Sequence, residues 1–227
     1  MKRLLAAALA LIMLLFGCGK EIADPIPVRP LDRFTDFGSF TAEPAADWDA
    51  ARSLVVSALD RYPESLLRQL GPVEIVLAAD LTGEDDFSHG SYAGFTQKTA
   101  DGWQIVLDVD AATAGTVHHE LAHVLDAILT EAGALTEAEW LALCPSTFTY
   151  GDANWEDYPD FFCDSYAMQN MQEDRARTFE DAMQLGPGVF ENAPALWLKL
   201  ELFSRALRTH FDTADWPVKT AWEAALE

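Results

Sequence analysis

The sequence has few cationic residues. Its 227 residues include 15 Lys and Arg against 37 Asp and Glu, which gives a formal net charge of −22 at pH 7. Binding to nucleic acid needs a basic face, and so does adhesion to anionic lipid through surface charge, so this deficit argues against both. The chain is nevertheless 50% apolar and 11% aromatic, which is enough to bury a core. We therefore expect a folded domain without a nucleic-acid partner.

Cysteine is also scarce. The chain has three, Cys18, Cys144 and Cys163, which are too few for a disulfide-based scaffold. Outside the cytoplasm, Cys144 and Cys163 could form a lasting disulfide. Spacing alone does not fix the geometry that a disulfide needs, so their pairing stays open at this stage.

The hydrophobic run at the N-terminus is short for a transmembrane helix. Lys2 and Arg3 precede an unbroken apolar stretch from Leu4 to Phe16. As a helix this stretch would rise about 20 Å, against roughly 30 Å for the hydrocarbon core of a bilayer. The pattern predicts an export signal over residues 1–17.

The end of this signal resembles the lipobox of bacterial lipoproteins. In that motif, represented here by Leu15-Phe16-Gly17-Cys18, the cysteine is diacylated and becomes the first residue of the mature chain. Two acyl chains give a stable membrane anchor. The resemblance implies a protein anchored to the cell membrane through Cys18 and facing outside the cytoplasm; an ordinary secretory signal followed by an incidental cysteine is the alternative.

The rest of the chain predicts a tether and one α+β domain. Residues 18–45 contain four prolines and no sustained apolar period, so we expect an extended membrane tether before a domain over 46–227. Apolar spacing predicts a sheet of about three or four strands early in the domain. These strands are expected at 73–81 and on both sides of a hairpin at 99–102. Helical periodicity predicts helices at 47–61, 63–70, 112–129, 136–143, 171–184 and 193–211, with a last turn at 220–226.

A metal-binding pattern lies in the helix expected at 112–129. His119-Glu120-Leu121-Ala122-His123 has the form H-E-x-x-H. At about 100° per residue its two imidazoles lie about 40° apart and one turn apart, so both can reach one ion. The apolar stripe of this helix, from Val117 to Ile128, is centred on the opposite face. Two imidazoles, a third protein ligand and an open position suit one catalytic Zn²⁺, with Glu120 placed to accept a proton from its water.

The third ligand has to come from later in the chain. His118 points about 100° away from His119 on the same helix, and neither His89 nor His210 lies in a suitable place, so carboxylates are better candidates. The acidic candidates are Glu156, Asp157, Asp160, Asp164 and Glu173. Glu173 falls in the first turn of a predicted helix at the edge of its apolar stripe, whereas Asp160 and Asp164 stand one turn apart beside aromatic residues.

The run from Tyr166 to Phe179 resembles the stretch that follows H-E-x-x-H in the catalytic domain of anthrax lethal factor and related zinc peptidases. In that family a tyrosine stands seven residues before a glutamate that opens a helix and is the third zinc ligand, as Tyr166 stands before Glu173 here. The resemblance covers about residues 118–179. It implies a zincin-like metallopeptidase domain in which a small early sheet packs on the H-E-x-x-H helix and the C-terminal half is mostly helical.

The same resemblance assigns roles to single residues. It implies zinc ligands at His119, His123 and Glu173, a catalytic glutamate at Glu120, and a helper hydroxyl at Tyr166 for the tetrahedral oxyanion.

One position departs from the family. Relatives often have an acid four residues after the glutamate ligand, where this chain has Arg177. Hydrogen-bonded support for the ligands must then come from another residue, and Asp126 and Glu180 are the candidates.

Together these features predict a membrane-anchored, monomeric zinc endopeptidase that cleaves peptides or proteins outside the cytoplasm. In zinc peptidases of this kind the strand before the active helix often pairs with the substrate, which points to residues 103–109. A non-catalytic lipoprotein that binds peptide or cell-envelope ligands and keeps zinc for structure is the alternative. Hydrolysis of a non-peptide amide is a third possibility, because the same water would attack either carbonyl.

Overall fold

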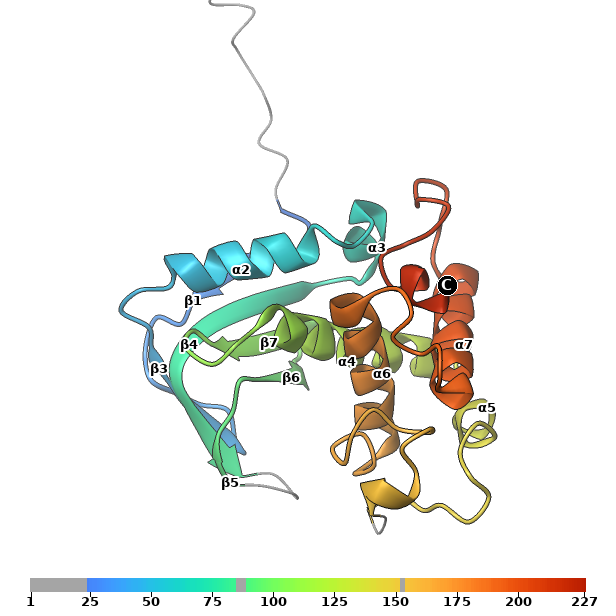
Figure 1. Ribbon diagram of the computed structural model, residues 1–227. Helices are drawn as coiled ribbons and strands as arrows, with labels where there is room; N and C mark the ends of the chain where they lie inside the picture. The colour runs from blue at the N-terminus through green and yellow to red at the C-terminus, as the bar shows by residue number, and fades with distance from the viewer. Residues whose placement is uncertain (1–23, 85–88, 152–153) are drawn as a thin grey trace, which may run out of the picture.

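The computed structural model describes residues 24–84, 89–151 and 154–227 (Figure 1). The expected export signal and Cys18 lie outside the described residues. Within the described ranges, no helix has both the length and the apolar character needed to cross a membrane.

The strands form one mixed sheet. In the described part of the chain it has seven strands: β1 (Val28–Pro30), β2 (Thr35–Asp36), β3 (Phe40–Pro44), β4 (Val73–Glu84), β5 (His89–Ser91), β6 (Gly94–Lys98) and β7 (Trp103–Asp108). The main order is β2-β3-β4-β7-β6, and β1 and β5 also pair with β4. Strand β4 runs parallel to β1 and β7, and the other pairs are antiparallel. Among the described strands, β6 therefore forms one edge of the sheet.

The sheet begins inside the segment that was expected to be a tether. Residues 28–44 supply β1, β2 and β3, and the side chains of Ile26, Leu31 and Ala42 are buried. The expectation of an extended tether is therefore wrong for this segment, and the folded domain includes Ile26 and residues 28–44. The prolines mislead because Pro30 and Pro44 stand at strand ends, where a missing backbone N–H is tolerated.

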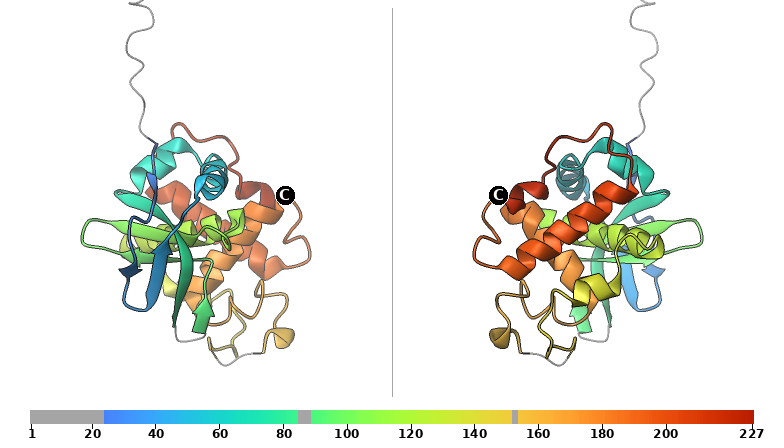
Figure 2. Two further views of the ribbon diagram at one scale, coloured as in Figure 1. Left: turned by 90° about the vertical axis from the view of Figure 1, so that its left-hand side faces the viewer. Right: turned by 90° about the vertical axis from the view of Figure 1, so that its right-hand side faces the viewer.

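The helices confirm the expected mixed α+β class, with strands early in the chain and helices late. They are α2 (Asp49–Leu59), α3 (Glu64–Gln69), α4 (Ala114–Glu131), α5 (Glu137–Leu141), α6 (Met171–Leu185) and α7 (Pro194–His210), with short 3₁₀ turns at Trp155–Asp157 and Glu223–Leu226. The sheet has more strands than expected, because β1, β2, β3 and β5 are short and carry weak sequence patterns. The turned views show α6 and α7 gathered to one side of the strands (Figure 2).

The largest core lies between the sheet and the helices. Helix α4 contacts β6 and β7 on one side and α6 on another. Its apolar residues Val117, Leu121 and Leu125 are fully buried in the same cluster as Ile75 and Ile105 of the sheet. Burying this stripe fixes the rotation of α4, so the residues on its other faces are held in place as well.

Candidate metal centre

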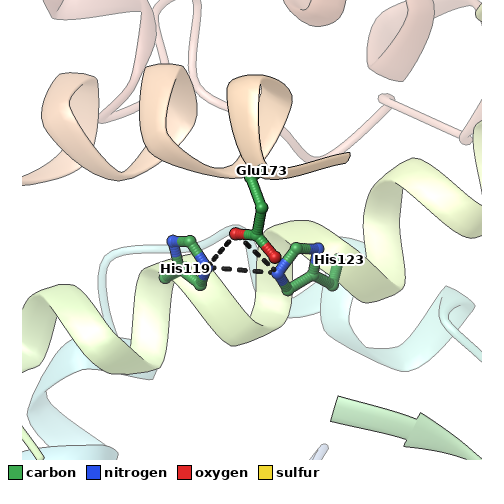
Figure 3. Close-up of side chains that lie close together, drawn as sticks. All are labelled: His119, His123 and Glu173. Carbon is green, nitrogen blue, oxygen red and sulfur yellow. Dashed lines mark hydrogen bonds and ion pairs between the residues drawn. The ribbon is translucent and has the colours of Figure 1, made fainter. Parts of the chain in front are cut away.

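Helix α4 presents its two motif histidines on one side. A capping box starts the helix: the Thr113 side chain accepts from the backbone N–H of Thr116, and the Thr116 hydroxyl bonds back to Thr113. His119 and His123 follow one turn apart, and their Nε2 atoms lie 3.1 Å from each other (Figure 3). The two rings thus converge on one point, as the motif predicts.

Helix α6 brings the carboxylate of Glu173 to the same point. Asn170 caps this helix, because its side-chain oxygen accepts from the backbone N–H of Glu173 at 2.9 Å. The Glu173 side chain points from α6 down toward the two rings of α4 (Figure 3). Its Oε2 atom lies 3.0 Å from His119 Nε2 and 3.6 Å from His123 Nε2.

The spacing of these three donors fits a metal ion. Ligand atoms about 2.0–2.2 Å from a tetrahedral zinc ion lie about 3.3 Å from one another, close to the separations seen here. Glu173 Oε2 is buried and has no hydrogen-bond partner in the described structure, although His119 Nε2 is 3.0 Å away. The two ring nitrogens and a carboxylate oxygen of Glu173 all lie within 4.8 Å of one another, so one ion could contact all three. Two imidazoles and one carboxylate are also a donor set typical of catalytic zinc.

The electrostatics of the cluster favour a bound cation. Burial alone would raise the pKa of Glu173, but contact with His119 and His123 outweighs it and lowers that pKa to about 2. Burial works against a charged His119, yet Glu173 and Glu180 raise its pKa to about 10. Glu173 and Glu180 thus favour the charged form of His119 when no metal is bound. A divalent cation between the donors would be balanced by the Glu173 carboxylate in the same way.

Glu180 supports His119 from behind. Its Oε2 lies 3.2 Å from His119 Nδ1, the ring nitrogen that does not face Glu173. A proton on Nδ1 that is donated to Glu180 leaves the Nε2 lone pair free for a metal, the arrangement common around zinc-binding histidines. Asp126, the other candidate for this role, instead forms a buried ion pair with Arg175 at 2.7 Å. Of the two candidates, Glu180 is the one that contacts a histidine of the pair.

Glu120 and Tyr166 lie beside the three donors, along the same cleft. The Thr96 hydroxyl of β6 donates to Glu120 Oε2 at 2.8 Å, a contact that the sequence did not indicate. The Tyr166 ring centroid is 5.9 Å from that of His119, and 40% of the tyrosine is exposed. The carboxylate of Glu120 is thus oriented by a neighbouring strand, whereas Tyr166 stands at the open side of the site.

The cleft extends to both sides of His119. One arm, of about 620 Å³, is lined by Phe95, Trp103 and the two motif histidines among others. A second arm, of about 500 Å³, shares Gly94, His119, Glu120 and Tyr166 with the first and continues toward Asp164. Strand β6 borders both arms. The candidate metal centre therefore lies partway along a groove rather than at its closed end.

The strand beside the cleft is not the one predicted. Residues 103–109 were expected to pair with substrate, but β7 is hydrogen-bonded to β4 on one side and to β6 on the other. It has no free edge. Among the described strands, the open edge belongs to β6. The hairpin after Lys98 was predicted, but the parallel pairing of β7 with β4, which places β7 inside the sheet, is not encoded in the sequence pattern.

The other candidate residues lie elsewhere. Asp160 is exposed, and Asp164 binds Arg177 at 2.9 Å. His118 is buried on another face of α4, where its Nδ1 lies 2.9 Å from the Tyr62 hydroxyl. Cys144 and Cys163 are free thiols, so the disulfide left open above is not formed. In the described ranges, His119, His123 and Glu173 are the one group whose spacing could hold a metal.

Comparison with known proteins shows that this chain and a protein of known structure have similar folds. The structure is similar to a crystal structure described as a putative zinc-binding metallo-peptidase from Bacteroides caccae, with a TM-score of 0.56 and 14% sequence identity. The match covers 83% of this chain and 80% of that chain. No family model and no curated protein matches the sequence. The chain thus shares a fold with a protein described as a metallo-peptidase.

Proposed function

We propose that the chain is a zinc endopeptidase of the lethal-factor-like type, with His119, His123 and Glu173 as the metal ligands. The observation that carries this proposal is the convergence of three donor atoms at tetrahedral spacing in an open groove. The shared fold with a protein described as a metallo-peptidase supports it.

The residues around the donors have distinct tasks in this proposal. Bound zinc would supply a Lewis acid and lower the pKa of a water molecule. The Glu120 carboxylate removes a proton from the attacking water and passes it to the leaving nitrogen, while the Thr96 hydroxyl holds one of its oxygens. Tyr166 donates its hydroxyl proton in a hydrogen bond to the oxyanion of the tetrahedral intermediate.

The groove suits an extended peptide. Strand β6 leaves one row of backbone N–H and C=O groups unpaired by any described strand, so a substrate can add to this edge. Because arms of the groove run to both sides of His119, a chain can pass through without ending there. This favours cleavage within peptides over removal of single terminal residues.

The N-terminal sequence supports a proposal for the place of action. We propose that Cys18 carries the lipid anchor and that the domain acts as a monomer outside the cytoplasm, where peptides or proteins are its substrates. Mass spectrometry of the mature N-terminus from cells that express the full chain would test this. A diacylated Cys18 is expected, and a mature chain that starts at another residue would contradict it.

Peptide profiling tests the activity. The purified domain is mixed with a random peptide library, with zinc, with a chelator, and with zinc restored after chelation. We expect cleavage only with zinc, and a loss of about 10²- to 10⁴-fold in Glu120→Gln, which cannot act as the base. Glu201→Gln on the exposed side of α7 is the matched control.

Two results would oppose the proposal. Equal cleavage by wild type and Glu120→Gln would remove Glu120 from the chemistry. A zinc-loaded wild type that cleaves no peptide would favour the non-catalytic, zinc-containing lipoprotein.

A further inference from the structure

Arg177 lies among three carboxylates beside the metal centre. Its Nε and Nη2 atoms contact Asp164 Oδ2 at 2.9 and 2.8 Å, its Nη1 donates to Glu180 Oε2, and its Nη2 is 3.6 Å from Asp181. This is the position where the resembling family often has an acid. The substitution therefore does not leave a gap: the arginine holds acids from two separate segments.

One of these acids acts on a proposed zinc ligand. The Glu180 oxygen that accepts from Arg177 is the same Oε2 that faces His119 Nδ1 at 3.2 Å. The second Glu180 oxygen accepts from Gln184 at 2.8 Å. With both oxygens held, the carboxylate has a fixed direction toward the imidazole.

The other acid holds the segment that carries Tyr166. Asp164 Oδ1 accepts from the backbone N–H of Ala167 at 2.9 Å, so the turn that it closes contains the tyrosine. Asp164 Oδ2 is the atom that binds Arg177. The guanidinium thus links the Tyr166 turn to α6 and, through Glu180, to His119.

Arg177 lines one arm of the groove, so a role in binding a substrate carboxylate has to be considered. Its side chain is 22% exposed. However, contacts with Asp164 and Glu180 already use its Nε, Nη1 and Nη2 atoms, and three acids balance its charge. Little capacity is left for an incoming anion, which favours a role toward the protein itself.

We propose that Arg177 is a positioning residue that couples the His119 side of the metal centre to the Tyr166 turn. By holding Glu180 it keeps the proton on His119 Nδ1 and the Nε2 lone pair toward the metal, and by holding Asp164 it keeps Tyr166 beside the site. This inference rests on the proposed function for the role of Tyr166 but not for the contact with His119.

The test compares variants that cut one link or both. Glu180→Gln weakens the first link, Asp164→Asn the second, Arg177→Met removes both, and Arg177→Lys can reach one acid but not two. Arg205→Met, from an exposed pair with Glu201 on α7, is the matched control. Three quantities are measured for each purified protein: zinc affinity by chelator competition, hydrogen exchange of the Ala167 amide, and kcat and KM on a cleaved peptide.

Each link has its own expected signature. Glu180→Gln should weaken zinc binding about 10- to 100-fold with unchanged exchange at Ala167. Asp164→Asn should speed that exchange and lower kcat several-fold at unchanged KM and zinc affinity. Arg177→Met should show both changes, Arg177→Lys should restore at most one of them, and Arg205→Met neither.

The coupling is overturned if Arg177→Met changes only one of the two signatures, or neither, or only lowers the unfolding temperature of the metal-free protein. Should the wild type bind zinc and cleave no peptide, the proposed function fails. Zinc affinity and Ala167 exchange still decide the coupling in that case, because neither depends on turnover.

Discussion

A fully buried ion pair joins the helix that carries Glu173 to the C-terminal helix. Lys199 of α7 and Asp174 of α6 are both completely shielded from solvent, and Lys199 Nζ lies 2.7 Å from Asp174 Oδ2. The lysine also donates to the Phe161 carbonyl at 2.6 Å, and the carboxylate accepts from Trp140 at 2.8 Å and Tyr150 at 2.7 Å. The pair therefore ties α6 to α5, α7 and the loop between α5 and α6.

Removing one partner leaves a buried charge without its counterion. Breaking a buried pair in this way destabilises a protein by about 3–5 kcal/mol. We expect about 3 kcal/mol for Lys199→Met, at the low end, because Trp140 and Tyr150 still donate to the carboxylate. Asp174→Asn should have a similar effect, since the lysine keeps the Phe161 carbonyl and lies 4.0 Å from the Phe162 ring centroid. For a domain of this size the change corresponds to about 6–12 °C in Tm.

The double variant separates the pair from the packing around it. Asp174→Asn with Lys199→Met leaves no charge at this pair, so we expect a loss of less than about 2 kcal/mol and a coupling energy of about 4 kcal/mol. Urea unfolding of the metal-free proteins, followed by tryptophan fluorescence, gives each free energy of unfolding.

The pH dependence supplies a second test of the same pair. Burial raises the pKa of Asp174, and Lys199 opposes that rise. Without the lysine the pKa of the carboxyl in the folded state lies further above its unfolded value. Stability then falls as pH rises through that interval, so the deficit of Lys199→Met should shrink in acid. Single variants that each lose less than about 1 kcal/mol, or losses that simply add in the double variant, would refute this reasoning.

Three further results are expected. Thr96→Val removes the hydrogen bond to Glu120 and should lower kcat by about tenfold with unchanged zinc affinity. Kinetics and chelator competition would measure these two quantities. An unchanged kcat would mean that Thr96 does not orient the base. Burial raises the pKa of Glu223. Hydrogen bonds from Arg208, the Thr220 N–H and Ser204 outweigh that effect and lower the pKa from 4.5 to about 2. The stability that this shift contributes is present above pH 4.5 and is lost toward pH 2. The free energy of unfolding, measured as a function of pH, should therefore fall by about 1–2 kcal/mol over this range. Glu223→Gln should lack this loss. For protein held in zinc at 100 times its Kd, chelation should lower the free energy of unfolding by about 2.7 kcal/mol, which is measured as a lower Tm. Glu173→Gln should show no such drop.

Local patterns in the sequence predicted the parts of the site that depend on helix geometry. His119 and His123 converge because residues four apart share a helix face, and the buried stripe around Leu121 sets the rotation of that helix. Glu173 could be predicted as a ligand because the family resemblance identified it among several acids. Its convergence with the histidines depends on how α6 crosses α4, which no local pattern shows.

The features that the sequence did not predict depend on contacts between distant segments. The prolines at positions 30 and 44 concealed short strands whose pairing partners lie in β4. The open edge of the sheet at β6 follows from pairing order rather than from composition. The sequence marked Arg177 only as a departure from the family pattern, and its contact with Asp164 forms only when the turn at Asp164 folds against α6.

The central claim of this account is that His119, His123 and Glu173 hold one zinc ion. Anomalous diffraction at the zinc absorption edge, from crystals of the zinc-loaded domain, tests it most directly. The account predicts a single peak about 2.0–2.2 Å from Nε2 of both histidines and from a Glu173 carboxylate oxygen. Zinc bound at another place, or a Glu173 side chain turned away from an ion on the two histidines, would contradict it.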